Sequence, residues 1–313
     1  MKLTPQKTAF LFPGQGSQIL GMGRNLAEKY PIAQDTFDEA DQILGFSLSK
    51  IMWEDADALN DTANTQPALF VHSIAAWRVF SRLAPEFEPA SVGGHSLGEL
   101  TALTVAGSLS FSDGLRLVRK RGELMHHAGE IAPGGMAAIL GVDIPSLEKI
   151  CAEASNENEI VQVANDNCPG QIVISGSKPA LERALVLAKD AGARRAVPLA
   201  VSIAPHSTLM SAIQRDFDEA LANVDITEAS LKVVGNVGAQ PLSTVEEIQA
   251  DLSAQLTSRV RWTESIQYMI SQGVETFLEL GSRNVLTGLL RRIDRSVKGI
   301  PLGEAKDFER FLL

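Results

Sequence analysis

The pentapeptide Gly94-His95-Ser96-Leu97-Gly98 constrains the fold of this chain more than any other stretch. The small and apolar residues 90–93 before it fit a buried strand, and residues 99–106 after it fit a helix. A serine on a sharp turn between a strand and a helix is typical of a nucleophile elbow, which lifts the hydroxyl above the edge of a sheet. The first N–H groups of the helix, beginning with Leu97, would then point at whatever Ser96 attacks. This context favours a catalytic serine over an incidental serine in a glycine-rich turn.

Length, composition and charge exclude several classes of protein. With 313 residues, of which 45% are hydrophobic and 21% charged, the chain suits a globular protein of two domains, or one domain with an insertion. The formal net charge of −10 argues against nonspecific nucleic-acid binding, which needs a basic surface. The two cysteines, Cys151 and Cys168, make neither a metal-ligand cluster nor a disulfide framework, so we expect no metal. No stretch suits a signal peptide or a membrane span. We therefore expect a cytoplasmic protein that binds neither nucleic acid nor a membrane.

The order of predicted elements changes between residues 134 and 199. There the patterns predict, in chain order, a strand, a helix, two strands, a helix and a strand, at residues 135–140, 145–154, 160–164, 171–175, 178–190 and 194–199. This β-α-β-β-α-β order is the ferredoxin-like arrangement. Residues 164–170 are predicted as a loop, with Asn165 and Asn167 as turn formers. The sequence thus predicts a small domain of residues 131–200 inserted into a large domain of residues 1–130 and 201–313.

Ser96 needs a base, because a free serine hydroxyl is a weak nucleophile. Of the five histidines, His206 is the best placed, because it lies in a loop after the inserted domain and just before a predicted helix. The other four are less well placed. His72 lies in an apolar predicted helix, His95 is the neighbour of the serine, and His126 and His127 lie at a helix end. No Asp or Glu between Ser96 and His206 stands out as the third member of a triad. A backbone carbonyl is another group that can orient an imidazole.

Several motifs together resemble one family. Phe12-Pro13-Gly14-Gln15-Gly16-Ser17-Gln18, combined with residues 94–99, is similar to the malonyl-CoA:acyl-carrier-protein transacylases. Supporting stretches follow in matching order, from about residue 8 to about residue 292, at 65–68, 119–122, 134–139, 169–176 and 285–289. The chain departs from the family pattern at Ala204-Pro205-His206, where the family often has Pro-Phe-His or Pro-Ser-His. Residues 258–262 and Gly281-Ser282 also differ.

The resemblance implies an α/β-hydrolase-like large domain with an inserted ferredoxin-like small domain. It implies that Ser96 carries the acyl group and that His206 acts as base and acid. It also implies an oxyanion hole made by the backbone N–H groups of Gln15 and Leu97, and a malonyl carboxylate bound by Arg121. The main-chain carbonyl of Gln255 would orient the histidine. Asn165 and Asn167 would line the cleft or contact the substrate.

The implied reaction transfers malonyl from malonyl-CoA to the phosphopantetheine thiol of acyl carrier protein, in support of fatty acid synthesis, without a cofactor. We expect a monomer, and a local basic patch for the acidic carrier protein, with candidates Arg116, Lys120, Arg194, Arg195, Arg291 and Arg292. Three alternatives remain open. These are a serine esterase or thioesterase, a non-enzymatic module that binds CoA or carrier protein, and an acyltransferase for another extender such as methylmalonyl.

Overall fold

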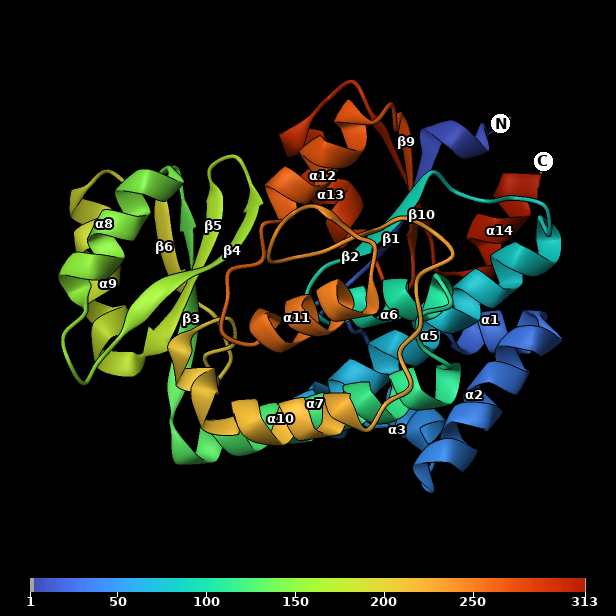
Figure 1. Cartoon of the computed structure of the whole chain (residues 1–313), viewed down its shortest axis with the longest axis horizontal. Helices are drawn as coiled ribbons and strands as arrows, with labels where there is room; N and C mark the ends of the chain where they lie inside the picture. Colours follow the sequence, from blue (N-terminus) through green and yellow to red (C-terminus); the bar gives the residue numbers. More distant parts are fainter. Residues whose placement is uncertain (1–2, 313) are drawn as a thin grey trace.

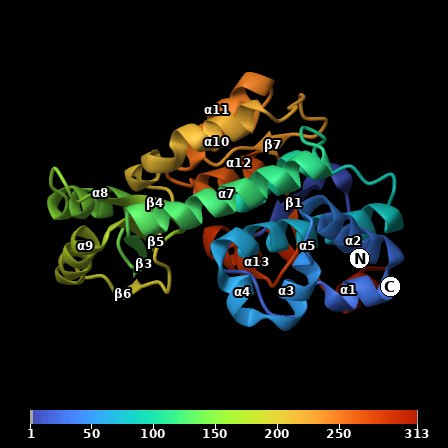
Figure 2. The same cartoon turned by 90° about the horizontal axis from the view of Figure 1, so that it is seen from below.

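The computed structural model describes residues 3–312 and comprises a larger and a smaller unit. Helix α7 (Phe111–Ile131) runs along the larger unit and leads directly into the first strand of the smaller one (Figures 1 and 2). Both chain ends lie on the larger unit, on the side away from the smaller one (Figure 1). Within residues 3–312, no helix combines the length and the apolar character needed to cross a membrane.

The larger unit is built on a six-stranded sheet. In spatial order its strands are β10 (Lys298–Leu302), β9 (Thr276–Leu280), β1 (Thr8–Phe12), β2 (Ser91–Gly94), β7 (Val233–Val234) and β8 (Pro241–Leu242). All neighbours are parallel except β8, which runs antiparallel to β7. In the central strand β1, Phe10 pairs with Val92 on one side and with Leu278 on the other. Every residue of β1 is buried, as expected for a parallel strand covered on both faces.

Alternate side chains of β1 enter two different cores. Phe10 and Phe12 pack with α5 (Thr62–Leu83) and α6 (Leu97–Val105), whereas Ala9 and Leu11 pack with α12 (Trp262–Ser271) and α13 (Val285–Ile293). The period of two along a strand produces this division. The other helices of the larger unit are α1 (Arg24–Lys29), α2 (Pro31–Leu44), α3 (Leu48–Glu54), α4 (Ala56–Asn60), α10 (Gln214–Ala222), α11 (Val245–Gln255) and α14 (Ala305–Leu312).

The smaller unit has an antiparallel sheet with two helices. Its elements in chain order are β3 (Gly134–Leu140), α8 (Ile144–Ala154), β4 (Val161–Cys168), β5 (Gln171–Ser177), α9 (Lys178–Asp190) and β6 (Arg195–Pro198). The spatial order of the strands is β4-β5-β3-β6. Ile139, Val163 and Ile174 form its core with Leu147 of α8 and Leu181 of α9. The chain is therefore a mixed α/β protein with one largely parallel and one separate antiparallel sheet.

Local sequence signals explain where some helices and strands begin or end, and they predict other boundaries wrongly. Ser110 caps α7 by accepting a hydrogen bond from the Asp113 N–H at 3.0 Å. The helix predicted just after His206 begins with a 3₁₀ turn over Thr208–Ile213, and α10 follows from Gln214. The predicted loop 164–170 is wrong, because β4 continues to Cys168 with two irregularities in its pairing to β5. Asn165 and Asn167 therefore lie on a strand.

Candidate active site

The turn at Ser96 has the geometry that the sequence predicts. Strand β2 ends at Gly94 and α6 begins at Leu97, so that Ser96 lies in the turn with φ 52° and ψ −110°. Such a backbone conformation is uncommon and strained for a residue other than glycine. A Cβ on Gly94 would lie 1.9 Å from the backbone of Gly98, and a Cβ on Gly98 would lie 2.0 Å from the Phe12 carbonyl oxygen. The two flanking glycines therefore allow the strand, the turn and the helix to pack this closely.

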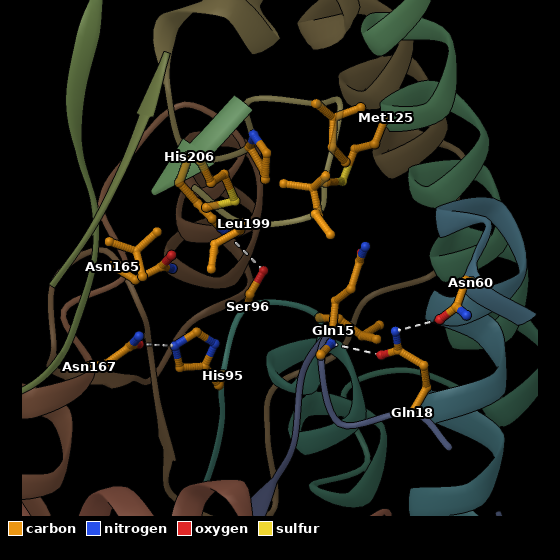
Figure 3. A pocket seen from close by; sticks show the side chains of 18 of the residues that line it. Gln15, Gln18, Asn60, His95, Ser96, Met125, Asn165, Asn167, Leu199 and His206 are labelled. Carbon is orange, nitrogen blue, oxygen red and sulfur yellow. Dashed lines mark hydrogen bonds between the residues drawn. The ribbon is translucent and has the colours of Figure 1, made fainter. Parts of the chain in front are cut away.

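His206 lies against the Ser96 hydroxyl. The distance from Ser96 Oγ to His206 Nε2 is 2.8 Å (Figure 3), and His206 Nδ1 is 2.9 Å from the Gln255 carbonyl oxygen. Because a carbonyl only accepts, Nδ1 carries the proton, and Nε2 is left to accept from the hydroxyl. Burial, followed by the positive charge of Arg121, lowers the pKa of His206 to about 3. The imidazole is therefore neutral at pH 7 and able to take a proton.

Arg121 brings a buried positive charge to the same hydroxyl. Its side chain is 1% exposed, and Nη2 lies 3.2 Å from Ser96 Oγ. Its other partners are neutral oxygens, Gln66 Oε1 at 2.6 Å and Gln255 Oε1 at 2.8 Å. Burial lowers the pKa of Arg121 to about 10, which leaves it charged at pH 7. Within residues 3–312, no carboxylate forms an ion pair with this guanidinium, and its Nε has no hydrogen-bond partner.

A network of buried polar side chains holds the backbone of the turn at Ser96 in place. Asn236, just after β7, accepts from the Ser96 N–H at 2.7 Å and donates to the Gly94 carbonyl oxygen at 2.8 Å. The Asn236 N–H donates to Glu99 at 3.0 Å, and the Gln255 side chain donates to both Glu99 and the Ser96 carbonyl oxygen. Burial and the neighbouring Asp251 carboxyl raise the pKa of Glu99 well above its ordinary value. Glu99 forms no ion pair with Arg121 in the described structure, although its charge favours the protonated guanidinium.

Two backbone N–H groups are free to bind a substrate oxygen. Gln15 follows β1 and Leu97 opens α6, and both residues line the same cavity as Ser96. Among the hydrogen bonds of the described residues, neither the Gln15 N–H nor the Leu97 N–H donates to a protein group. The Ser96 N–H, by contrast, is occupied by Asn236. Gln15 and Leu97 are thus the amides near the hydroxyl that an oxyanion could engage.

The cavity lies between the two units and has a volume of about 620 Å³. The larger unit contributes Ser96, Arg121 and His206, while apolar side chains of the smaller unit, among them Met136 and Val173, cover the opposite wall. The two predicted asparagines also line it (Figure 3). Asn167 Oδ1 lies 2.8 Å from His95 Nε2. Asn165 is almost fully buried, with 6% of its surface exposed.

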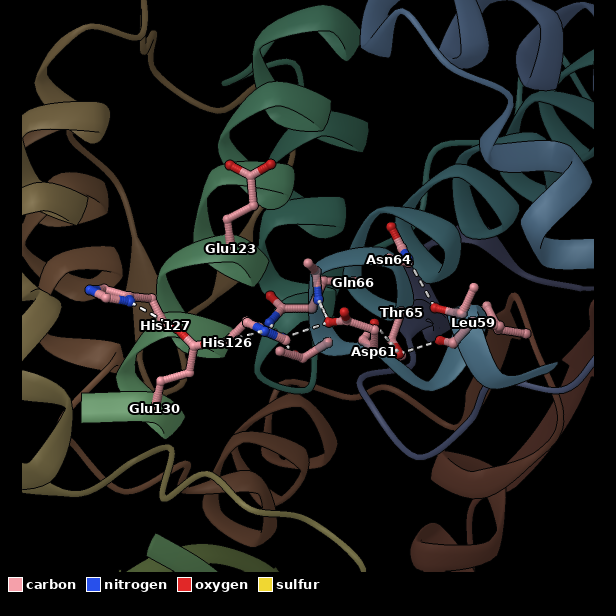
Figure 4. A network of polar contacts seen from close by, with 12 residues as sticks. Leu59, Asp61, Asn64, Thr65, Gln66, Glu123, His126, His127 and Glu130 are labelled. Carbon is pink, nitrogen blue, oxygen red and sulfur yellow. Dashed lines mark hydrogen bonds and ion pairs between the residues drawn. The ribbon is translucent and has the colours of Figure 1, made fainter. Parts of the chain in front are cut away.

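The histidines near the end of α7 have acidic partners. His126 Nδ1 lies 3.0 Å from Asp61 Oδ1, and His127 Nδ1 lies 3.2 Å from Glu130 Oε2 (Figure 4). Both side chains are about half exposed. Of the five histidines, His206 is the one that hydrogen-bonds to Ser96 in the described structure.

Comparison with known proteins agrees with this arrangement. The family described as acyl transferase domain matches residues 9–304. The malonyl CoA-acyl carrier protein transacylase of Bacillus subtilis is 46% identical over 306 residues, which are 97% of this chain and 95% of that protein. The chain belongs to the malonyl-CoA:acyl-carrier-protein transacylase family.

Two solved structures of this transacylase family extend the comparison. The acyl carrier protein S-malonyltransferase of Vibrio cholerae is 41% identical, with a TM-score of 0.94 over 97% of this chain and 99% of that chain. A second structure is described as a type II PKS acyl-carrier protein in complex with its malonyl-transacylase. It is 39% identical, with a TM-score of 0.94 over 98% of this chain and 99% of that chain.

Several residues of this transacylase site were not predicted from the sequence. Asn236, Gln66 and the side chain of Gln255 are buried amides that hold Ser96 or Arg121. One signal was available for Asn236, since it lies two residues after β7 and ligand sites gather at the carboxyl ends of parallel strands. Gln66 and Gln255 offer no such signal. The departure from the family at Pro205 does not move His206 out of reach of Ser96.

Proposed function

We propose that this chain transfers the malonyl group of malonyl-CoA to the phosphopantetheine thiol of acyl carrier protein, in support of fatty acid synthesis. The observation that carries the proposal is Arg121, a buried cation that forms no ion pair in the described structure, 3.2 Å from the Ser96 hydroxyl. A carboxylate-bearing acyl group would supply the missing anion, and a guanidinium fork suits a planar carboxylate. A serine esterase for neutral esters has no use for such a charge.

In the first half-reaction, malonyl-CoA binds with its free carboxylate at Arg121. His206 Nε2 takes the Ser96 proton as Oγ attacks the thioester carbonyl carbon, and the N–H groups of Gln15 and Leu97 bind the resulting oxyanion. The tetrahedral intermediate then collapses, and the carbon–sulfur bond breaks. The proton held by His206 goes to the departing CoA sulfur, which leaves malonyl as an ester on Ser96.

The second half-reaction runs the same steps with another thiol. His206 takes the proton of the phosphopantetheine thiol, whose sulfur attacks the malonyl-serine ester. When the ester bond breaks, Ser96 regains its proton from His206. A relative that was solved in complex with an acyl carrier protein supports this acceptor. Neither half-reaction requires a metal or a redox cofactor.

The remaining residue roles are proposed on the contacts given above. The Gln255 main-chain carbonyl orients His206, which supports the neutral tautomer that a base needs. Asn167 holds His95 and, with Asn165, lines the cavity beside the nucleophile, in reach of the acyl chain or the pantetheine arm.

The finer description of the fold is also a proposal. The largely parallel sheet with a serine turn after β2 supports an α/β-hydrolase-like domain of residues 1–130 and 201–313. The β-α-β-β-α-β order and the antiparallel strand order support a ferredoxin-like domain of residues 131–200. A monomeric state and a cytoplasmic location stay predictions from the sequence.

Intact mass spectrometry tests the proposed function. We expect the protein to gain one malonyl group when mixed with malonyl-CoA, and to lose it to carrier protein when holo-carrier is added. Ser96→Ala should show no gain, because the hydroxyl on the turn is absent. An adduct of equal yield on Ser96→Ala would contradict the nucleophile. Rapid loss of the adduct to water without carrier would favour the thioesterase alternative, and methylmalonyl-CoA in parallel would test the choice of extender.

A further inference from the structure

One side chain of the smaller unit reaches the backbone of His206. Gln162, on β4, donates from Nε2 to the His206 carbonyl oxygen at 3.2 Å and to the Thr257 carbonyl oxygen at 3.1 Å. Its Oε1 accepts from the Thr208 N–H at 3.1 Å. The single amide therefore ties together the turn that carries His206 and the chain just after α11. None of the roles described so far involves this residue.

The backbone of His206 needs such support. Its φ is 60°, in the left-handed region that few residues other than glycine adopt. The Leu256 carbonyl oxygen fixes its N–H at 2.9 Å, and the Gln255 carbonyl oxygen fixes its ring. Both of these anchors come from the end of α11. The Gln162 side chain supplies the anchor on the carbonyl, and it comes from the other unit.

Strand β4 holds Gln162 firmly in place. It is an edge strand of the small sheet, and the edge that faces away from β5 forms a β-bridge from Asn165 to Val260 of the larger unit. The Val260 N–H donates to the Ala164 carbonyl oxygen at 2.8 Å, and the Asp166 N–H donates to the Val260 carbonyl oxygen at 2.9 Å. These bonds set the distance between β4 and the segment after α11, and hence the reach of Gln162.

We propose that Gln162 is a positioning residue that holds the His206 backbone so that Nε2 stays in line with the Ser96 hydroxyl. The proposal rests on the proposed function in one respect, namely that His206 is the base. Its consequence is that proton transfer in the larger unit depends on one specific contact from the smaller unit, the Gln162 side chain on the His206 carbonyl oxygen. Gln162 touches neither Ser96 nor the His206 ring in the hydrogen bonds described, so it should affect the rate of acylation without affecting substrate binding.

The first variant is Gln162→Met, which keeps the length of the side chain and removes all three hydrogen bonds. We expect acylation of Ser96 by malonyl-CoA, followed by quenched-flow mass spectrometry, to slow roughly 10- to 100-fold, because a displacement of about 1 Å of a catalytic group can cost about 10²-fold. The dissociation constant of malonyl-CoA, measured with Ser96→Ala also present, should change less than about twofold, since Arg121 is untouched. Acylation at the wild-type rate would overturn the proposal.

Thr263→Val is the matched control. Thr263 Oγ1 donates to Asp166 Oδ1 at 2.7 Å, so it too links the larger unit to β4, but it has no contact with His206 among the described hydrogen bonds. We expect Thr263→Val to acylate at nearly the wild-type rate. If it slows acylation as much as Gln162→Met, the contact merely holds the units together and the proposal fails.

Gln162→Glu provides a readout that a purely structural role would not change. At neutral pH the carboxylate keeps an acceptor for the Thr208 N–H but cannot donate to the two carbonyl oxygens, so acylation should be slow. At lower pH the carboxyl gains a proton that it can donate, and the ratio of its rate to that of the wild-type protein should rise between about pH 8 and pH 5. A constant ratio would contradict the donor role, and this comparison remains decisive if Gln162→Met folds poorly.

A serine-directed fluorophosphonate separates this proposal from the proposed function. Its reaction with Ser96 also needs the base but involves no malonyl group. If the wild-type protein reacted with the reagent and formed no malonyl adduct, the proposed function would fail. The effect of Gln162→Met on labelling would still test the role of Gln162.

Discussion

The surroundings of His206 determine how acylation should respond to pH. The base must be neutral to accept the Ser96 proton, and burial together with Arg121 lowers its pKa from 6.5 to about 3. Acylation should therefore not fall as pH drops from 7 through 6.5, where an ordinary histidine gains its proton, and it should decline only on approach to about pH 3. The pH dependence of kcat/KM for malonyl-CoA, over the range in which the protein stays folded, measures this. A loss of half the rate near pH 6.5 would contradict it.

Arg121 should discriminate between acyl groups. Arg121→Ala removes the partner of the malonyl carboxylate, and the loss of one member of such a pair costs about 2–5 kcal/mol, so malonyl transfer should fall about 30-fold or more. Acetyl transfer should persist or increase, because Ser96 and His206 remain. The measurement is the ratio of malonyl to acetyl adduct on Ser96. Arg119→Ala, on the same helix but bonded to Ala63 and Asn64, is the control and should leave the ratio unchanged.

The sequence indicated the residues proposed to carry out the reaction better than the residues that hold them in place. Ser96 was predictable because its motif has a backbone cause, and His206 because it lies in a loop before a helix. Gln162 and Asn236 were not predictable, because their amide side chains act through hydrogen bonds to backbone groups of other strands and turns. Which groups meet depends on how the sheets pack, and no spacing along the chain encodes it.

The first N–H groups of helix α13 donate to a buried glutamate, and the titration of this carboxyl should change the stability of the protein with pH. Glu279, at the end of β9, accepts from the Leu286 and Thr287 N–H groups at 2.9 and 2.7 Å, and burial raises its pKa to about 7. Between about pH 4.5, where the unfolded side chain titrates, and about pH 7, the folded protein keeps a proton that the unfolded chain releases. This contribution to stability is full below that window and is lost as pH rises through it.

Glu279→Gln should remove this contribution to the pH dependence. We expect the unfolding temperature of the wild type to fall, relative to that of Glu279→Gln, as pH rises from about 5 to about 7.5. Thermal unfolding followed by circular dichroism measures both proteins at each pH. Parallel curves would show that this carboxyl does not titrate in the window.

The elements that sequence patterns failed to predict have a common cause. The loop prediction for residues 164–170 relied on Asn165 and Asn167 as turn formers, but pairing with β5 and with Val260 keeps them on a strand. Strand β10 was missed because Gly299 and Pro301 resemble a break. It lies at the edge of the sheet and, among the described strands, pairs with β9 alone, and a proline is tolerated at such an edge. In both cases tertiary pairing overrode local preference.

Carrier protein must approach a molecule whose net charge is itself negative. The six candidate basic residues come from three places, α7, the region of β6 and the end of α13, and Arg292 is already bonded to Gln171 and Pro169. We expect transfer to carrier to slow as salt concentration rises, since local attraction acts mainly on the association rate. Arg195→Ala, close in sequence to Leu199 of the cavity wall, should reduce this salt dependence, and Arg215→Ala on α10 should not. A transfer rate independent of salt would contradict the idea.

The cavity between the units has one further consequence, which concerns the order of events. Ser96 opens into a space of about 620 Å³, and the donor and the acceptor carry the same pantetheine arm. Two such arms cannot both present sulfur to one hydroxyl, so each must vacate the space before the other enters. Initial rates at several fixed concentrations of carrier should then give parallel double-reciprocal lines, the pattern of ping-pong kinetics. Free CoA should compete with holo-carrier protein for the malonylated enzyme, so the leaving group of one half-reaction becomes an inhibitor of the next.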